Sequence, residues 1–286
     1  MLLTTDFSLE GVHFRREWHP PDSVGHRCLA RGLSDIAAMG GEPMAAFLSL
    51  ALPPELPQSW VDRFMSGLLR LGRQFDVQLA GGDTASSPDG VLADIVVVGR
   101  VPVGKALLRS GARPGDSLYV TGELGLSARI LHWLREGGLA TLGAKARGGK
   151  TAHAPHFYPQ PRIAVGRWLR ERGLATAAID VSDGLSTDLG HICEESGVGA
   201  LVREASIPRP SGLPTSSLHY ALHGGEDYEL LFTAAGLRPV PAKIAGVRVA
   251  RIGEIIRGRG MWLVDSHGQR KPLAPRGWEH FRTSQD

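Results

Sequence analysis

The stretch that most constrains the fold runs from Ile179 to His191 and reads Ile-Asp-Val-Ser-Asp-Gly-Leu-Ser-Thr-Asp-Leu-Gly-His. A small apolar segment, 175–179, precedes it, and apolar residues recur at 185, 189 and 192, the spacing of a helix face. The stretch therefore predicts a strand, a tight turn at Asp183-Gly184, and a helix whose first N–H groups Ser182 or Asp183 can cap.

Three carboxylates crowd this junction, those of Asp180, Asp183 and Asp188, and the sequence places no Lys or Arg between positions 179 and 192. Carboxylates so close together repel one another unless a cation lies among them. Two interpretations stay open on this stretch alone: an ordinary capped helix with solvated aspartates, or part of a cation site.

Length and composition narrow the class of protein. A chain of 286 residues can hold two modest domains, and 42% hydrophobic residues with 37 Gly and 19 Pro fit a turn-rich α/β protein. The net charge of +3 is too balanced to indicate nucleic acid, and no apolar run approaches the ~20 residues of a membrane span. Two cysteines, Cys28 and Cys193, make no disulfide framework, so we expect buried thiols in a reducing cytoplasm.

Periodicity predicts a mixed order of helices and strands without an internal repeat. Asp6 should begin a loop, the segment 141–156 should be a mobile loop, and a domain boundary should fall near 107–113. Helices are expected over 22–39, from a cap at Ser59, over 124–135 and over 163–172, and strands over 44–52, 77–80, 91–101, 117–121, 225–232 and 247–256.

The pairing of an acid with glycine recurs outside the first stretch. In Gly81-Gly82-Asp83-Thr84, two glycines at a strand end would let a phosphate approach the backbone. In the segment 224–229, Gly-Gly-Glu-Asp-Tyr-Glu, three acids occupy four positions, and an extended chain would put Glu226 and Tyr228 on one face. Asp35 lies near a helix end among apolar neighbours, so its charge needs a compensating partner.

Several aspartates at the ends of expected elements point to one kind of chemistry. A few carboxylates, shared with waters and substrate phosphates, are typical of Mg²⁺. No Cys/His spacing suits zinc, and no Gly-x-Ser-x-Gly nucleophile turn is present. The segment 143–151 resembles a P-loop but has one residue too many and no preceding strand. The aspartates in question are Asp6, Asp35, Asp83, Asp180 and Asp183.

Taken in order, these motifs resemble the thiamine-monophosphate kinase family, within the superfamily of aminoimidazole ribonucleotide synthetase and selenophosphate synthetase. The segments 81–84 and 224–230 favour that family over its relatives. The resemblance covers nearly the whole chain, through positions 4–6 with 13–14, 33–40, 81–84, 109–116, 179–191, 224–230 and 277–281.

The resemblance implies an α/β (α+β) fold of two domains like those of aminoimidazole ribonucleotide synthetase, 1–108 and 109–286, with ATP in the cleft between them. It implies a kinase of thiamine biosynthesis that transfers the γ-phosphoryl group of ATP to thiamine monophosphate with several Mg²⁺ ions. The N-terminal domain would pair with a second copy in a cytoplasmic homodimer, and neither nucleic acid nor a membrane is expected as a partner.

The same resemblance assigns roles position by position. Asp183, Asp83 and Arg109 would be catalytic, because transfer onto a dianion is limited by charge repulsion, which cations relieve. The Mg²⁺ ligands would be Asp6, Asp35, Asp83, Asp180 and Asp183. ATP or its metals would contact Thr4, Thr5, Gly82, Asp83, Arg109 and Ser182, and thiamine monophosphate would contact His13, Glu226 and Trp278.

The sequence departs from the family pattern in two respects. Family members have about 40 residues before the equivalent of Met1, including a Gly-Asp-Asp segment, and a domain seldom opens on a strand with a polar site, so we expect residues upstream. Gly32 replaces an Asn of the family pattern. Two other functions stay open: another ATP-dependent enzyme of the superfamily, such as a selenophosphate synthetase, or a truncated inactive member that binds nucleotide.

Overall fold

The computed structural model describes residues 1–145, 155–210 and 217–278. The chain divides into two compact units. Unit 1 comprises Met1–Ala106 and Ile130–Arg167, and unit 2 comprises Leu107–Arg129 and Trp168–Asp286. Two helices, α3 (Leu126–Lys145) and α4 (Ile163–Glu171), contribute residues to both units.

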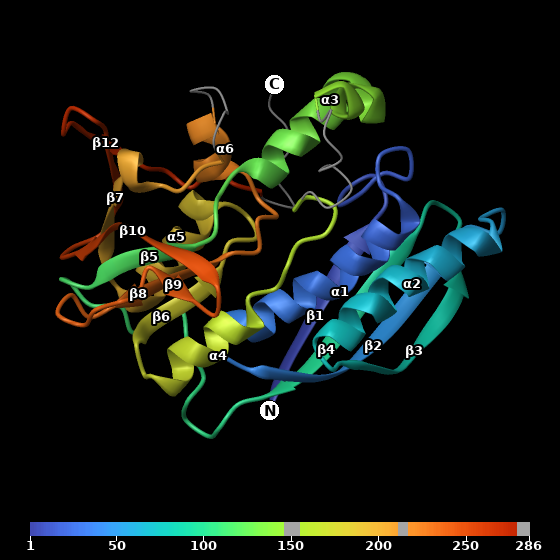
Figure 1. The fold of residues 1–286 in the computed structure, drawn as a ribbon, viewed down its shortest axis with the longest axis horizontal. Helices are drawn as coiled ribbons and strands as arrows, with labels where there is room; N and C mark the ends of the chain where they lie inside the picture. The colour runs from blue at the N-terminus through green and yellow to red at the C-terminus, as the bar shows by residue number, and fades with distance from the viewer. Residues whose placement is uncertain (146–154, 211–216, 279–286) are drawn as a thin grey trace. The chain divides into compact units, whose positions relative to one another are not determined.

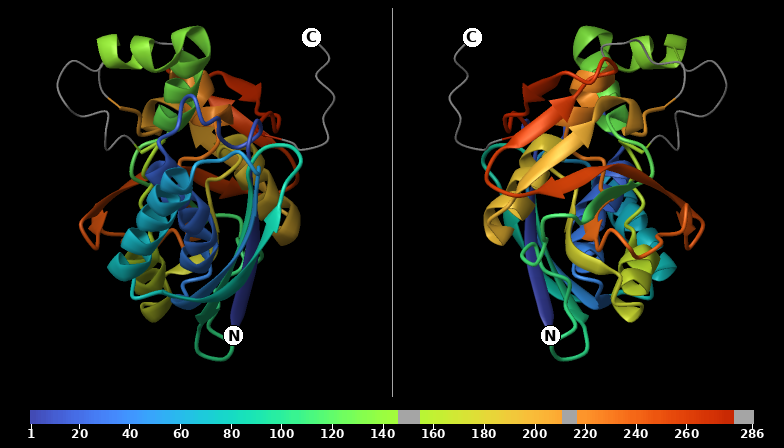
Figure 2. Two further views of the ribbon diagram at one scale, coloured as in Figure 1. Left: turned by 90° about the vertical axis from the view of Figure 1, so that its right-hand side faces the viewer. Right: turned by 90° about the vertical axis from the view of Figure 1, so that its left-hand side faces the viewer.

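Unit 1 is a four-stranded sheet with helices on one face (Figure 1). The sheet order is β1-β4-β2-β3, in which β2 and β3 are parallel and the other neighbours antiparallel. Two long helices, α1 and α2, lie side by side and contact the sheet (Figure 2). The bounds are β1 (Leu2–Leu9), α1 (Pro21–Ala38), β2 (Glu42–Leu52), α2 (Gln58–Gln74), β3 (Gln78–Ser86) and β4 (Leu92–Arg100).

The core of unit 1 forms because α1 and α2 turn apolar side chains toward the sheet. Leu33 and Ile36 of α1 and Leu68 of α2 are fully buried. The two helices pack closely because two glycines face backbone: a Cβ at Gly25 would lie 1.9 Å from the carbonyl oxygen of Phe64. A Cβ at Gly67 would lie 1.9 Å from the carbonyl oxygen of Asp22.

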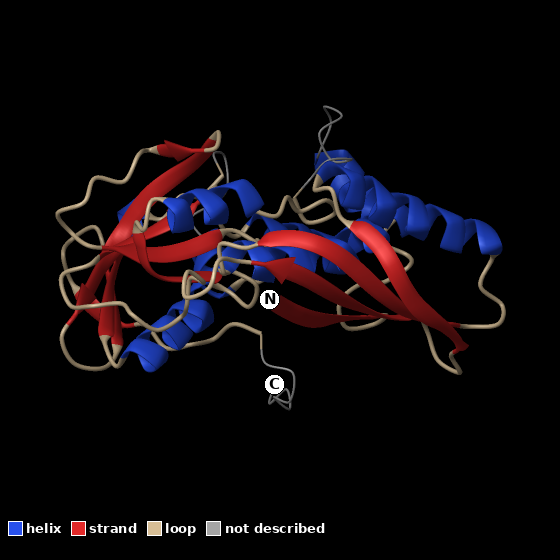
Figure 3. Ribbon diagram, turned by 90° about the horizontal axis from the view of Figure 1, so that it is seen from below, coloured by secondary structure: helices blue, strands red, loops and turns tan. Residues whose placement is uncertain are grey.

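The second face of this sheet exposes apolar side chains. Figure 3 shows α1 and α2 along one side of the strands only. On the other side Leu3 is 70% exposed, Phe7 54%, Met44 48% and Phe47 40%. A run of large apolar side chains in water is unusual for a monomer and typical of an interaction surface.

Unit 2 is built on a second sheet, in which the order of the described strands is β12-β11-β7-β10-β5-β8-β6, with β9 paired to β10. The pair β11–β7 is parallel and the other pairs are antiparallel. The bounds are β5 (Ser117–Thr121), β6 (Ala175–Asp180), α5 (Leu185–Ser196), β7 (Gly199–Arg203), a 3-10 turn (Glu204–Ser206), α6 (Ser217–His223), β8 (Leu230–Ala234), β9 (Lys243–Ile244), β10 (Val247–Ile256), β11 (Met261–Val264) and β12 (Arg270–Pro272).

The stretch from Ile179 to His191 folds in unit 2 as its pattern predicted: the end of β6, a turn, and then α5. The apolar residues of α5 enter the buried core, where Leu185, Leu189 and Ile192 pack in one cluster with Leu118 and Leu231 of the sheet. Because β6 and α5 are both buried on their apolar sides, the turn between them is held at a fixed place.

The predicted elements are present in the predicted order, but several details were wrong, and the strands β7, β9, β11 and β12 and the helix α6 were not predicted. Asp6 lies within β1 rather than at the start of a loop, and β3 continues through Gly81–Thr84 as a strand paired with β2. Ser59 does not cap α2, which begins at Gln58 after Pro57. The helix α3 extends to Lys145, into the segment expected to be a loop, and 146–154 lie outside the described residues. A further error concerns 225–229 and is taken up below.

Two expectations about composition have structural counterparts. Cys28 and Cys193 are both buried thiols, as predicted. Among the described helices, none combines the length and the apolar character that a membrane crossing requires.

Candidate functional site

The helix-facing side of unit 1 brings three predicted site residues near one another. The Thr4 hydroxyl on β1 donates a hydrogen bond to the Asp35 carboxylate on α1. Asp6, two residues along the same face of β1, lies 3.7 Å from the Nε of Arg31 on α1. Within unit 1, the Asp35 carboxylate therefore accepts a hydrogen bond from a hydroxyl, and the Asp6 carboxylate lies near a positively charged guanidinium.

The opposite face of the sheet carries further predicted residues of unit 1. Thr5 donates a 2.7 Å hydrogen bond to Asp94 on β4. The register aligns Asp94 with Ser49 of β2, and Ser49 with Asp83 of β3, so these side chains form one row across three strands. Asp83 is exposed. Sequence reasoning missed Asp94, whose signal was a single charge within the apolar run of β4.

Gly82, expected to lie near phosphate, has a structural role in this sheet. Its φ is 152°, and a Cβ added to it would lie 1.9 Å from the carbonyl oxygen of Leu48 on the neighbouring strand. No side chain fits there, so the glycine allows β3 to pair closely with β2. Its predicted contact with ATP stays a prediction.

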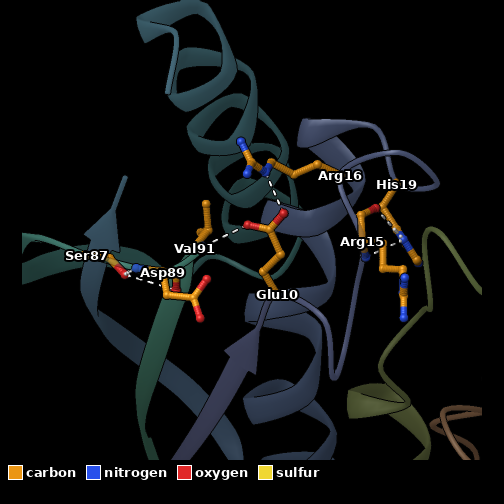
Figure 4. Close-up of polar contacts among 7 residues, drawn as sticks. All are labelled: Glu10, Arg15, Arg16, His19, Ser87, Asp89 and Val91. Carbon is orange, nitrogen blue, oxygen red and sulfur yellow. Dashed lines mark hydrogen bonds and ion pairs between the residues drawn. The ribbon is translucent and has the colours of Figure 1, made fainter. Parts of the chain in front are cut away.

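His13 lies in the loop after β1, and the fold fixes that loop at several points. The His13 Nδ1 accepts a 3.0 Å hydrogen bond from the N–H of Leu9, and the buried Arg27 donates to the His13 carbonyl oxygen at 3.2 Å. Figure 4 shows a further anchor, where the Glu10 carboxylate accepts the N–H of Val91 at 2.9 Å and the Nε of Arg16 at 2.5 Å. His13 is thus presented by a braced loop.

In unit 2 the turn after β6 gathers four predicted site residues. The Ser182 carbonyl oxygen accepts the N–H of Glu226 at 2.7 Å. The Asp183 carbonyl oxygen accepts the N–H of Trp278 at 3.1 Å. Two predicted substrate residues are therefore hydrogen-bonded through their backbones to the turn that carries a predicted catalytic aspartate. Trp278 is 46% exposed and accessible to a ligand ring.

The turn itself is held by Asp188 and not by the residues expected to cap the helix. The N-cap is Gly184, with φ 112°, and neither Ser182 nor Asp183 makes a side-chain cap. The buried Asp188 carboxylate accepts the N–H of Asp183 at 3.2 Å and that of Gly184 at 3.0 Å. The first prediction was wrong because the helix begins one residue later than expected, with Gly184 as the N-cap, and a residue inside the helix binds the N–H groups of the turn.

The electrostatics of this turn favour a cation. Burial raises the pKa of Asp188 well above its usual range, and the nearby charges of Asp180 and Asp183 raise it further. Asp180 is 5% exposed at the end of β6. Carboxylates whose charges repel to this extent are stabilised by a nearby positive charge.

The segment 225–229 was expected to be the first part of an extended strand, 225–232, and this was wrong. Strand β8 begins only at Leu230, because Glu226 has φ 66° and Tyr228 φ 52°. Asp227 and Glu229 are buried and bind protein groups: Asp227 accepts the N–H of Gly125 at 2.8 Å. Two of the three acids in this motif therefore have a structural role.

Arg109 lies in unit 2 with an exposed side chain, in a turn organised by the last residue of α5. The Ser196 hydroxyl donates to the Arg109 carbonyl oxygen at 3.1 Å and accepts the N–H groups of Gly111 and Ala112. The turn fixes the backbone and leaves the guanidinium accessible to an anion.

Within the described residues, no three His, Cys, Asp or Glu side chains form a ready-made metal cluster. The predicted ligands are divided between the units: Asp6, Asp35 and Asp83 in unit 1, and Asp180 and Asp183 in unit 2. All are hard oxygen donors. Mg²⁺ commonly takes only one or two protein carboxylates per ion and completes its shell with water and phosphate, so the donor set fits this ion.

Comparison with known proteins places both halves of the chain in one family. Residues 1–101 match the N-terminal domain of AIR synthase related proteins, and residues 113–265 match the C-terminal domain. The two matched ranges account for most of the chain and include every candidate residue except Arg109, which lies between them, and Trp278, which lies after the second.

Individual relatives are similar over almost the whole chain. The thiamine-monophosphate kinase of Escherichia coli K12 is 38% identical over 294 residues, which cover 99% of this chain and 87% of the relative. The crystal structure of thiamine-monophosphate kinase from Stenotrophomonas maltophilia K279a is 36% identical with a TM-score of 0.84, covering 94% of this chain and 86% of that one. A structure described as "AaThiL complexed with AMPPCP and TMP" is 31% identical with a TM-score of 0.81, covering 98% and 86%. The chain belongs to the thiamine-monophosphate kinase family of AIR synthase related proteins.

Proposed function

We propose that this chain transfers the γ-phosphoryl group of ATP to thiamine monophosphate and so forms thiamine diphosphate. The observation that carries the proposal is similarity over 98% of the chain to a structure that holds AMPPCP and TMP. The turn at Asp183 supports it, because residues suited to bind a ligand flank an aspartate in a negative environment.

The residues of unit 2 have distinct tasks in this proposal. Asp180 and Asp183 supply oxygen ligands, and Mg²⁺ bound there would neutralise the charge that keeps two phosphates apart. The exposed Arg109 binds a phosphate oxygen, and Ser182 contacts the nucleotide or its metal. The indole of Trp278 stacks on a ring of thiamine monophosphate.

The residues of unit 1 complete the assignment. Asp6, Asp35 and Asp83 serve as further metal ligands, and Thr4, Thr5 and Gly82 contact ATP. The hydrogen bond from Thr4 to Asp35 supports a shared task, since it fixes the orientation of that carboxylate. His13 contacts thiamine monophosphate from the braced loop after β1.

The test is formation of thiamine diphosphate from thiamine monophosphate and ATP, with and without Mg²⁺. Product that depends on Mg²⁺ supports the proposal, including the metal. A chain that binds both substrates without turnover is the inactive alternative, and an assay on a version extended upstream shows whether added residues restore the reaction. Phosphorylation of selenide instead of thiamine monophosphate would identify the selenophosphate synthetase alternative.

We further propose a cytoplasmic homodimer that buries the exposed face of the unit 1 sheet. The occupant is a second copy, because a flat apolar face on a sheet can pair with itself about a two-fold axis. Phe47→Glu should give a monomer in light scattering, whereas Val103→Glu, at a side chain that is 101% exposed and outside the strands, should leave the mass unchanged. Equal masses for wild type and Phe47→Glu would contradict this interface.

A further inference from the structure

The segment 226–229 is strained in a way that its sequence does not explain. Glu226 and Tyr228 both have φ in the left-handed region, at 66° and 52°, where residues with a side chain are uncommon. Tyr228 is only 3% exposed, so it is surrounded by packed protein. Such a conformation persists where the surroundings hold it in place, and it is frequent at ligand sites.

One side of this segment is bonded to the turn that carries the candidate residues. The N–H of Glu226 donates to the Ser182 carbonyl oxygen at 2.7 Å, and the N–H of Tyr228 donates to the Val181 carbonyl oxygen at 2.9 Å. A Cβ at Gly225 would lie 2.4 Å from the Ser182 oxygen, so the two backbones are in close contact. Any shift of 226–229 therefore moves Ser182 or breaks these bonds.

The other side is held by the two buried acids that alternate with the strained residues. The Asp227 carboxylate accepts the N–H of Gly125 at 2.8 Å and also that of Ser127, at the start of α3. The Glu229 carboxylate accepts the hydroxyl of Thr121 at 2.6 Å. Both acids are buried, so loss of a hydrogen-bond partner would leave an unsatisfied polar group in the protein interior, which is costly.

Thr121 connects the second of these anchors to the sheet. Its hydroxyl donates to Glu229 and accepts the N–H of Leu230 at 2.8 Å, and the residue is fully buried. A Cβ at Gly122 would lie 1.9 Å from a Glu229 carboxylate oxygen, so this carboxylate is closely confined. The end of β5 thus fixes the start of β8.

We infer that Asp227 and Glu229, with Thr121, are positioning residues: they hold Glu226 in its left-handed conformation against Ser182, where it can meet the substrate. They act through Glu226 and the turn and do not touch the ligand. The inference rests on the proposed function for its kinetic consequence, but its structural content does not depend on it.

The experiment compares Thr121→Val, which removes the hydroxyl at nearly constant volume, with Thr121→Ser, which keeps it. We expect Thr121→Val to raise the KM for thiamine monophosphate about tenfold and the KM for ATP clearly less, because the broken network holds the substrate residue Glu226 directly and reaches Ser182 only through it. Thr121→Ser should restore the wild-type KM. Equal changes in both KM values, or a lower melting temperature alone, would overturn the inference.

A second measurement does not use activity. Hydrogen exchange of the Glu226 and Tyr228 amides should be faster in Thr121→Val and unchanged in Thr121→Ser. Asp227→Asn, which replaces one carboxylate oxygen with an NH2 donor beside two backbone N–H donors, serves where Thr121→Val does not fold, and should also speed this exchange. Unchanged exchange in the folded variant would contradict the inference, whereas a wild-type chain that makes no thiamine diphosphate would contradict only the proposed function.

Discussion

The backbone N–H of Trp278 donates a 3.1 Å hydrogen bond to the carbonyl oxygen of Asp183, across 95 positions of sequence (278 − 183). The preceding residue explains how the two can approach: a Cβ on Gly277 would lie 2.0 Å from the same oxygen and 2.6 Å from the Thr187 hydroxyl. The last described segment of the chain is therefore seated directly on the turn that carries the candidate catalytic residue.

Gly277→Ala should move Trp278 away from Asp183. We expect the KM for thiamine monophosphate to rise about tenfold or more, because a displacement of about 1 Å at a substrate residue has this effect. The matched control is Gly190→Ala in α5, where an added Cβ would make only ordinary contacts, the nearest at 3.6 Å. Steady-state kinetics with each substrate varied in turn measures the effect, and a wild-type KM in Gly277→Ala would remove Trp278 from the substrate site.

Asp183→Asn should abolish turnover without unfolding the protein. The amide cannot replace a carboxylate as a ligand for Mg²⁺, so we expect a loss of at least about 100-fold in kcat. The free energy of unfolding without metal should stay equal or rise by roughly 1 kcal/mol, because one of three repelling charges is removed. An assay of product formation measures the loss in kcat, and thermal melting measures the change in stability.

The control for Asp183→Asn is Asp89→Asn, at an exposed position in the turn before β4. It removes the same charge and should leave kcat unchanged. Full activity in Asp183→Asn would show that this carboxylate is not a required ligand, and a large loss of stability would show that its main role is in folding.

Glu226→Gln should weaken the use of thiamine monophosphate more than the use of ATP. Gln keeps the length of the side chain and adds no new strain at φ 66°, so the change isolates the charge. We expect a higher KM for thiamine monophosphate with the KM for ATP nearly constant. The reverse pattern, measured by varying each substrate at saturation of the other, would assign Glu226 to the nucleotide.

The strand–turn–helix at 179–191 could be predicted because two local signals agree there. Apolar spacing marks the β6 and α5 elements, and Asp183-Gly184 marks the turn. The same is true of α1 and β10, whose observed bounds lie within one residue of the predicted ones. Local pattern was sufficient wherever burial of one face decided the structure.

Local pattern failed where a distant partner decides the backbone. Asp6 and Asp83 were placed at element ends, but strand pairing with β4 and β2 extends both strands through them. The left-handed turns at Glu226 and Tyr228 depend on hydrogen bonds to Val181 and Ser182, which no sequence spacing reveals. Tertiary contacts of this kind override propensity.

The residues of the candidate site could likewise be predicted only in part from the sequence. Which acids are accessible to a ligand and which are structural could not be read from residue type: Glu226 is partly exposed, whereas Asp227 and Glu229 in the same motif are buried against backbone and hydroxyl donors. The sequence indicates only that Asp188 is one of three neighbouring carboxylates, whereas in the structure it accepts the N–H groups of the turn.

Buried histidines should make unit 1 sensitive to acid. His26 lies with a ring nitrogen 2.7 Å from the Pro159 carbonyl oxygen. Burial lowers its pKa to about 4, the hydrogen bond to Pro159 opposes this shift, and the charge of Arg70 adds to it. Burial likewise lowers the pKa of His19 to about 3. Because the unfolded pKa is near 6.5, the unfolded state binds more protons below it, so these groups lower stability as pH falls from about 6.5 toward 4.

His26→Gln isolates this effect, since Gln can still donate to the Pro159 oxygen but does not titrate. Buried Asp188 and Asp227 have raised pKa values and change stability in the opposite direction, so the comparison of variant with wild type is needed. Between pH 6 and pH 4.5 the wild type should lose about 1 kcal/mol per pH unit more than the variant, measured by urea unfolding. Parallel pH profiles would show that His26 is already protonated, or solvated, in the folded protein.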